Sequence, residues 1–256
     1  MKRFVSTLFL LLLPLGLLAQ EIPDFSANYL VKLNGLQAGE LKRRLSTNED
    51  GSRQFKSSTK AKGVFSFFKP DLVEETSTWK FLGSQVRPQH YLYERTGGKK
   101  DKYMSLNFDW QTNQLYIDDK KQPWQLNLEH GTLDKLVYQI ALMSDLADEK
   151  TTFNYRIADG GKLKNYDIRI VGKEVITTPR GKIDTIKLIR YREGKNKRQT
   201  TLWCAPKLNY LPVQLEHTEK SGSVFTAVLR RLKGIPTENV FIPVKSKPSN
   251  YGQVIN

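Results

Sequence analysis

The chain has 256 residues with 41 Lys and Arg against 26 Asp and Glu, a net charge of +15, and a single cysteine, Cys204. One cysteine excludes an internal disulfide, so stability must come from burial of apolar side chains, for which this length suffices. The positive charge favours anionic partners, although a solvated basic surface is an equally simple explanation.

Residues 1–19 have the pattern of a cleaved secretory signal peptide, in which two basic residues precede an apolar run at 8–18. The run is shorter than the roughly 20 residues of a membrane-spanning helix, and no later segment approaches that length. Gln20 stands where a lipidated cysteine would follow. We therefore expect an unanchored, soluble protein in the periplasm, with lipids or acidic polymers rather than nucleic acid as its anionic partners.

Apolar and polar residues alternate in many short segments of the chain. The first segment places five residues on one face: Phe25, Ala27, Tyr29, Val31 and Leu33. After a tight-turn signal at Asn34-Gly35, the alternation continues through Leu41, Arg43 and Leu45. Further runs occupy 72–81, 86–93, 102–110, 114–117, 153–157, 166–171, 183–192, 199–204, 211–217 and 224–232. This rhythm predicts a mainly β protein, with roughly ten or more antiparallel strands in an open barrel or a sandwich.

One segment near 132–147 breaks the alternation. Its apolar residues recur at helical spacing, and Asp134 falls in the first turn, where the helix dipole favours an acidic residue. We expect a single amphipathic helix there, packed on the sheet or plugging it. Because prolines and glycines recur after Gly234, we interpret 20–233 as one β-rich domain and 234–256 as an irregular tail.

No catalytic, metal-binding or cofactor-binding motif is recognisable. His90, His130 and His217 lie on three different expected elements, and none has the spacing of a zinc site. The chain has no G-x-S-x-G elbow, Walker loop or dinucleotide fingerprint. A non-enzymatic protein without a cofactor is therefore the preferred interpretation, and a hydrolase with carboxylates from distant strands is the least favoured alternative.

Two groups of residues are candidates for a binding site. Aromatic side chains could line a pocket for an acyl chain: Phe65, Phe67, Phe68, Trp79, Tyr91, Trp110 and Trp203. Basic residues of the segment 183–198 could present a positive face: Lys187, Arg190, Arg192, Lys197 and Arg198. The alternatives are structural, namely core packing for the aromatic residues and the polar exterior of a sheet for the basic ones.

Five short motifs follow one another in a characteristic order. They are Tyr29…Gly35…Gly39-Glu40, Asn107-Phe108-Asp109-Trp110, Leu133-Asp134-Lys135-Leu136-Val137-Tyr138, Thr178-Pro179-Arg180-Gly181, and Leu202-Trp203…Leu211-Pro212-Val213. From about Tyr29 to Leu232 the series resembles the bacterial periplasmic family called domain of unknown function 3108. The resemblance implies an exported β-rich protein, mainly of Gram-negative bacteria, and brings no established activity and no catalytic residue.

From these observations we expect a protein that binds or carries an amphiphilic anionic component of the cell envelope, a lipid or glycolipid. Aromatic residues would hold its apolar part, and lysine or arginine its head group. The alternative is an envelope-assembly scaffold that binds another protein or an acidic polymer through a basic surface.

Overall fold

The computed structural model describes residues 22–63, 66, 71–98, 100–191 and 198–244. The expected signal peptide, residues 1–19, lies outside the described residues, as do Phe65, Phe67, Phe68, Arg192 and Lys197. The described part contains a sheet of 15 strands, the helix α2 (Tyr138–Ala147) and a 3-10 turn, η1 (Pro206–Leu208). The strands are β1 (Phe25–Leu33), β2 (Leu36–Thr47), β3 (Arg53–Ala61), β4 (Leu72–Leu82), β5 (Gln85–Thr96), β6 (Lys102–Asp109), β7 (Gln114–Asp118), β8 (Trp124–Asn127), β9 (Leu133–Asp134), β10 (Phe153–Ala158), β11 (Leu163–Thr178), β12 (Gly181–Tyr191), β13 (Gln199–Ala205), β14 (Leu211–Thr218) and β15 (Val224–Lys233).

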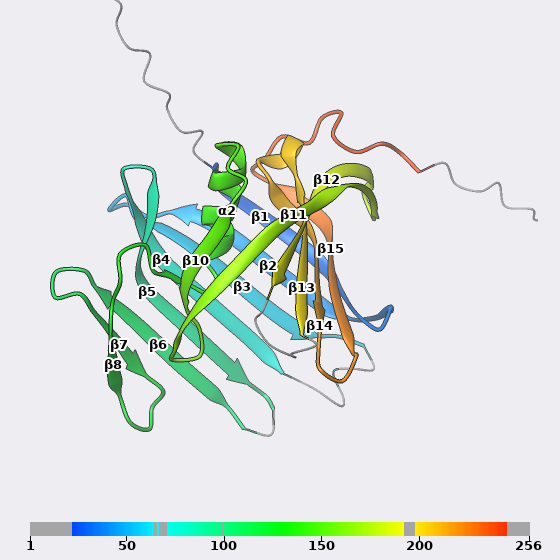
Figure 1. Cartoon of the computed structure of the whole chain (residues 1–256). Coiled ribbons are helices and arrows are strands. Elements are labelled where there is room, and N and C mark those ends of the chain that lie inside the picture. Colours follow the sequence, from blue (N-terminus) through cyan, green and yellow to red (C-terminus); the bar gives the residue numbers. More distant parts are fainter. Residues whose placement is uncertain (1–21, 64–65, 67–70, 99, 192–197, 245–256) are drawn as a thin grey trace, which may run out of the picture.

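The strand order is β8-β7-β6-β5-β4-β3-β2-β1-β15-β14-β13-β12-β11-β10-β9. Every ladder is antiparallel except the short one between β9 and β10, which is parallel. Strands that follow one another in sequence are neighbours in the sheet, except β8 and β9, which form its two edges, and β1 pairs with β15 in its middle. The sheet curls without closing (Figure 1). The expected mainly β architecture with an open curled sheet is therefore confirmed.

The apolar residues of the alternating segments face the inside of the curl, which we call the inner face. It carries the largest buried side chains, among them Tyr29, Leu45, Phe55, Trp79, Tyr91, Leu106 and Ile117. Because successive side chains of a strand point to opposite faces, the polar residues between them face outward. The amino-acid alternation thus positions one continuous core on the inner face.

The edge strand β9 lies against the inner face of β4 and β5. The Ser77 hydroxyl donates to Asp134 Oδ2 at 2.5 Å, and Lys135 Nζ lies 3.0 Å from Glu75 Oε1. The strands β6, β7 and β8 extend past this contact. β8 touches the β10–β11 turn, where the Trp124 indole N–H donates to the Gly161 carbonyl at 3.3 Å. We call this junction of β9 and β10 with β4 to β8 the seam.

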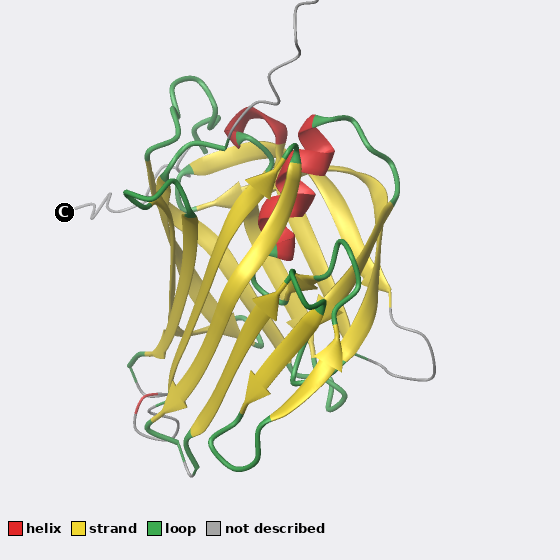
Figure 2. Ribbon diagram, turned by 90° about the vertical axis from the view of Figure 1, so that its left-hand side faces the viewer, coloured by secondary structure: helices red, strands yellow, loops and turns green. Residues whose placement is uncertain are grey.

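The helix begins later than its sequence pattern predicts, at Tyr138 instead of near 132. Leu133 and Asp134 pair with β10, and the Asp134 carboxylate accepts the backbone N–H groups of Leu136 and Val137 at 2.8 Å each. Because of this turn, α2 begins only at Tyr138. α2 lies inside one end of the curled sheet, where it acts as a plug (Figure 2), and seven of its ten residues are buried. Apolar residues consequently surround most of the helix, instead of forming one stripe.

The C-terminal segment 234–244 packs on the body of the sheet although it has no regular strand. Ile235 and Val240 are buried, and Ile242 exchanges two backbone hydrogen bonds with Lys182 of β12. In the described part of the chain, no helix is both long and apolar enough to span a membrane.

Candidate functional site

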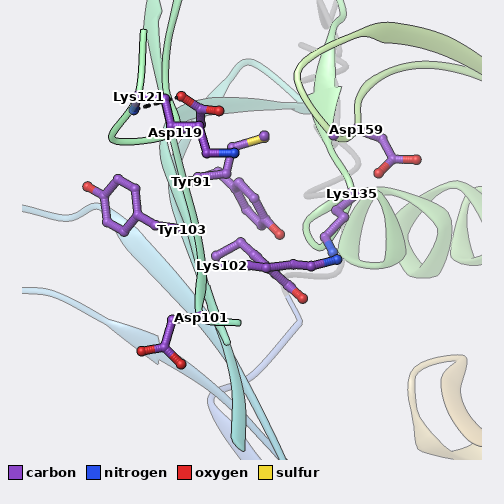
Figure 3. A pocket seen from close by; sticks show the side chains of 11 residues that line it. Tyr91, Asp101, Lys102, Tyr103, Asp119, Lys121, Lys135 and Asp159 are labelled. Atoms are coloured by element: carbon purple, nitrogen blue, oxygen red, sulfur yellow. Dashed lines mark hydrogen bonds between the residues drawn. The ribbon is translucent and has the colours of Figure 1, made fainter. Parts of the chain in front are cut away.

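A cavity of about 430 Å³ lies at the seam. Its lining residues come from three parts of the sheet: Tyr91 and Tyr93 of β5; Asp101, Lys102, Tyr103 and Met104 at the start of β6, with Asp119 and Lys121 of the β7–β8 connection; and, opposite these, Lys135, Asp159 and Gly160. In Figure 3, Lys135 and Asp159 lie on one side of the cavity and the other labelled residues on the opposite side. We call this space the seam cavity.

The apolar wall of the seam cavity belongs to the inner face of β5 and β6. Tyr91 pairs with Leu106, and Tyr93 with Met104, so these four side chains share one face of the two strands. Tyr91 is 2 % exposed, whereas Tyr93 and Met104 are half-buried and border the open space. The wall therefore combines aromatic and thioether groups, which suit contact with an apolar or ring-shaped part of a ligand.

Two of the aspartates in the wall are already engaged within the chain. Asp159 accepts hydrogen bonds from Lys164 Nζ at 2.6 Å and from the Tyr166 hydroxyl at 3.1 Å. Burial acts to raise its pKa, but the hydrogen bond and charge of Lys164 outweigh burial and hold the pKa below the usual range. Asp119 accepts the backbone N–H groups of the two residues of its own turn, Lys121 and Gln122.

Lys102 and Lys121 contrast with these aspartates. Neither side chain makes a hydrogen bond or an ion pair with the described part of the chain, and Asp101 has no such partner there either. Lys135, by comparison, pairs with Glu75, and its Nζ lies 4.3 Å from the centre of the Tyr93 ring. The cavity thus offers two ammonium groups and one carboxylate that are free to bind a ligand.

A buried polar network lies beneath the apolar wall. The Tyr91 hydroxyl donates to Glu75 Oε1 at 2.7 Å, the same oxygen that pairs with Lys135. Burial and the neighbouring Glu75 charge raise the pKa of Tyr91 far above its usual range. Tyr91 is therefore a permanent hydrogen-bond donor, and the network fixes the positions of Lys135 and the Tyr91 ring.

Asp134 completes this network on the side of α2. It has no exposed surface and accepts three hydrogen bonds, from Ser77, Leu136 and Val137. Burial raises its pKa to about 6, although these three hydrogen bonds act in the opposite direction. Ser77 belongs to β4, and Leu136 and Val137 precede α2, so the role of Asp134 is to join β4 to the start of α2.

The described residues contain no group of three or more His, Cys, Asp or Glu that could hold a metal ion. Cys204 is buried, and burial raises the pKa of its thiol. His90 and His217 each bond a hydroxyl group, Ser105 and Thr200 respectively, away from the seam cavity. The arrangement at the cavity suits binding of a charged group beside an aromatic surface.

The structure disperses the aromatic residues that the sequence grouped together. Tyr91 lines the seam cavity, whereas Trp79 is 1 % exposed within the core. Trp203 lies buried on the outer face and donates to Glu174 Oε2 at 3.0 Å. Trp110 borders a separate hollow of about 770 Å³ and donates to the Pro88 carbonyl at 2.6 Å. These four residues do not form one pocket.

The candidate basic face is also divided. Arg190 shares the inner face of β12 with the buried Leu188, and its guanidinium lies 4.2 Å from the centre of the Tyr166 ring. Lys187 points to the opposite face and pairs with Glu174 at 3.0 Å. Arg198 pairs with Glu219 at 2.8 Å. The described basic residues of this segment therefore lie on different surfaces.

The lysines of the seam cavity are not among the residues that the sequence pattern singles out. Lys102 continues the inner-face alternation of Met104, Leu106 and Phe108, and a lysine in phase with apolar residues is a usable signal. Lys121 and Lys135 lie in connections, where alternation carries no information. Their approach to β5 and β6 depends on how the strands pack at the seam.

The fold is similar to those of several solved structures. A β-barrel-like protein of the domain of unknown function DUF1849 from Brucella abortus is 9% identical, with 84% of this chain and 99% of that chain covered and a TM-score of 0.54. A DUF1329 family protein from Desulfovibrio piger is 11% identical over 84% of this chain and 86% of that one, with a TM-score of 0.23. The MucA/MucB complex of Pseudomonas aeruginosa gives 9% identity, coverage of 85% and 90%, and a TM-score of 0.18.

Of these three, the Brucella structure is the one similar enough to support a shared fold, and at 9% identity it supports the fold alone. No functionally curated protein shows significant sequence similarity to the chain. Residues 28–230 match the family model described as "Protein of unknown function (DUF3108)". This match spans most of the 15-stranded sheet, from β1 to β15. The protein therefore belongs to the DUF3108 family.

Proposed function

We propose that this protein binds an amphiphilic molecule with an anionic head group in the seam cavity, as a periplasmic binding or carrier protein for an envelope lipid or glycolipid. The observation that carries the proposal is the position of Lys102 and Lys121. Both line the cavity beside the apolar wall, and neither is neutralised by the described part of the chain. An anionic group bound there would supply the missing partner, because ammonium groups form their strongest hydrogen bonds with charged oxygens.

The dimensions of the cavity support a head group as its occupant. Ligand pockets commonly enclose about 300 to 1,000 Å³, and the seam cavity lies at the lower end of that range. A longer apolar chain would continue along the inner face, where Val31, Val73 and Ala227 are only half-buried. The excess of basic over acidic residues, which remains after removal of Lys2 and Arg3 with the expected signal peptide, would assist capture of such an anion by long-range attraction.

The test is an isothermal calorimetric titration of the purified mature protein with monododecyl phosphate, at concentrations below those at which this compound forms micelles. We expect saturable binding, and at least about tenfold weaker binding when Lys102→Ala and Lys121→Ala are combined, since each lost charged hydrogen bond is worth about 1.5–3 kcal/mol. Lys56→Ala with Lys60→Ala is the matched control, because these lysines are exposed on β3 and do not line the cavity. Equal weakening in both double variants, or no binding by the unmodified protein, would contradict the proposal.

A further inference from the structure

A buried arginine on the inner face of β2 has no acidic partner. Arg43 lies in phase with Leu41 and Leu45 and is 8 % exposed. Its Nη1 donates to the side-chain oxygen of Gln139 at 2.7 Å, and its guanidinium lies 5.7 Å from the centre of the Tyr29 ring. It makes no ion pair with the described part of the chain, and its buried Nε meets no acceptor there.

Arg190 of β12 is a half-buried arginine that also lacks an acidic partner among the described residues. It makes neither an ion pair nor a hydrogen bond with the described residues, and its Nε is buried without an acceptor. Its guanidinium stacks over Tyr166, whose ring meets that of Tyr138 edge to face at 5.3 Å. Because Arg43 contacts Gln139, both arginines approach the first turn of α2.

Tyr138, the first residue of α2, lies within the influence of both guanidinium groups. Burial raises the pKa of its hydroxyl, whereas the charges of Arg190 and Arg43 act to lower it. This hydroxyl makes no hydrogen bond with the described part of the chain. The positive end of the helix dipole adds to the same potential.

The nearby carboxylates do not compensate these donors. Asp134 is engaged by Ser77, Leu136 and Val137, and Glu75 by Tyr91 and Lys135. Buried polar groups are almost always paired, and a guanidinium cannot escape its charge by losing a proton. Near the start of α2, the buried Nε atoms of Arg43 and Arg190 therefore have no acceptor among the described residues, and a bound anion would supply one.

We propose that Arg43, Arg190 and Tyr138 form an internal site for a phosphate group at the N-terminal end of α2. A phosphate has enough acceptor oxygens for donors from three side chains, and the guanidinium fork matches its geometry. The proposal goes beyond the binding of a head group at the seam, because none of these three residues lines the seam cavity. The phosphate is either a free anion or part of a larger ligand.

The experiment compares thermal unfolding of the mature protein in chloride and in inorganic phosphate at equal ionic strength, with monododecyl phosphate and dodecanol in separate arms. A higher midpoint with inorganic phosphate supports a site for the free anion. A higher midpoint with monododecyl phosphate, but with neither inorganic phosphate nor dodecanol, supports a site for the phosphate of a larger ligand. No rise with either phosphate compound would overturn the proposal.

Variants locate the effect. Arg43→Gln with Arg190→Gln should abolish the phosphate-dependent rise and weaken phosphate binding at least about tenfold. The control is Arg44→Gln with Arg231→Gln, which removes two exposed arginines and should keep the rise. An undiminished rise in the first variant would overturn the site. If that variant fails to fold, Arg190→Gln alone, at a half-buried position, gives the same comparison by calorimetry.

This result is separable from that of the seam cavity. The combination of Lys102→Ala and Lys121→Ala should leave the response to inorganic phosphate unchanged. A loss of that response in the lysine variant would assign the anion to the seam cavity and overturn the internal site.

Discussion

At the start of α2, the buried carboxylate of Asp134 and the buried guanidinium of Arg43 have opposite hydrogen-bonding situations. Asp134 accepts three hydrogen bonds from neighbouring residues. Arg43 donates to the side-chain amide of Gln139 and interacts with the Tyr29 hydroxyl, but its Nε has no acceptor among the described residues. A buried charge whose partners all belong to the chain holds the fold together, whereas one without such partners weakens the fold and is available to a ligand.

The largest effect is expected from Asp134→Ala. This change leaves the Ser77 hydroxyl and two buried backbone N–H groups without an acceptor, so we expect a loss of about 4 kcal/mol in the free energy of unfolding. Urea denaturation measures it. Asp109→Ala is the control, because Asp109 also accepts two backbone N–H groups but in an exposed turn, where water replaces them. Similar losses in both variants would contradict a special role for Asp134.

Asp134 should also make stability depend on pH. Its folded-state pKa of about 6 exceeds the ordinary value of 3.8, so the folded state binds the proton more tightly than the unfolded state. Protonation of Asp134 therefore contributes fully to the free energy of unfolding at low pH. As the pH rises from about 4 to about 6, this contribution of about 3 kcal/mol is lost. Subtracting the pH profile of Asp134→Asn from that of the unmodified protein isolates this contribution. Parallel profiles would show that the carboxyl group titrates normally.

Arg43→Met should have a smaller effect on stability than either change at Asp134. In chloride buffer we expect the free energy of unfolding to stay within about 1 kcal/mol, because removal of a desolvated charge offsets the lost bond to Gln139. Arg53→Met provides the contrast, since Arg53 is also buried but pairs with Asp24 and donates to the Ile22 carbonyl. There we expect a loss of about 2 kcal/mol. The reverse order of the two losses would refute the distinction between paired and unpaired arginines.

The smallest effect on stability is expected at the seam cavity. Lys102 and Lys121 are exposed and have no partner in the described part of the chain. Replacing either with alanine should therefore change the free energy of unfolding by less than about 0.5 kcal/mol. Thermal unfolding tests this directly. A larger loss would mean that these lysines support the fold, and their effect on ligand binding would then have to be reinterpreted.

The alternation of apolar residues predicts most of the sheet, because burial of one face of each strand is a local property of the sequence. The start of the helix is not predictable in this way. Leu133 and Asp134 fit a helical pattern, but pairing with Ile157 and Ala158 of β10 extends them as a strand. Helical periodicity describes only residues that are close in sequence, so it cannot predict a pairing between 133–134 and 157–158. This pairing overrides the local preference of Leu133 and Asp134 for a helix.

The candidate sites show the same limit. The alternation of Leu41, Arg43 and Leu45 places Arg43 on the apolar face of its strand, as the structure has it. The lack of an acidic neighbour on this face is a property of the folded sheet, since it depends on strands far away in sequence.

For Arg190 the sequence pattern is misleading. Its basic neighbours suggest an outer surface, whereas its register with Ile168 and Thr200 puts it inside the curl.

The pairing of β1 with β15 sets a constraint on how the chain folds. The remaining ladders join strands that follow one another in sequence, so they can form as soon as each pair is available. The β1–β15 ladder runs from Ser26 opposite Lys233 to Leu33 opposite Phe225, and even the contact between Asn34 and Val224 at its end spans 190 residues. Closure of so long a loop is slow, and topologies rich in such contacts fold slowly. Until β15 is in place, β1 and β14 each present an unpaired edge, and edges of this kind recruit strands from other molecules. Insertion of β15 is thus the event that protects the folding chain from aggregation through these two strands.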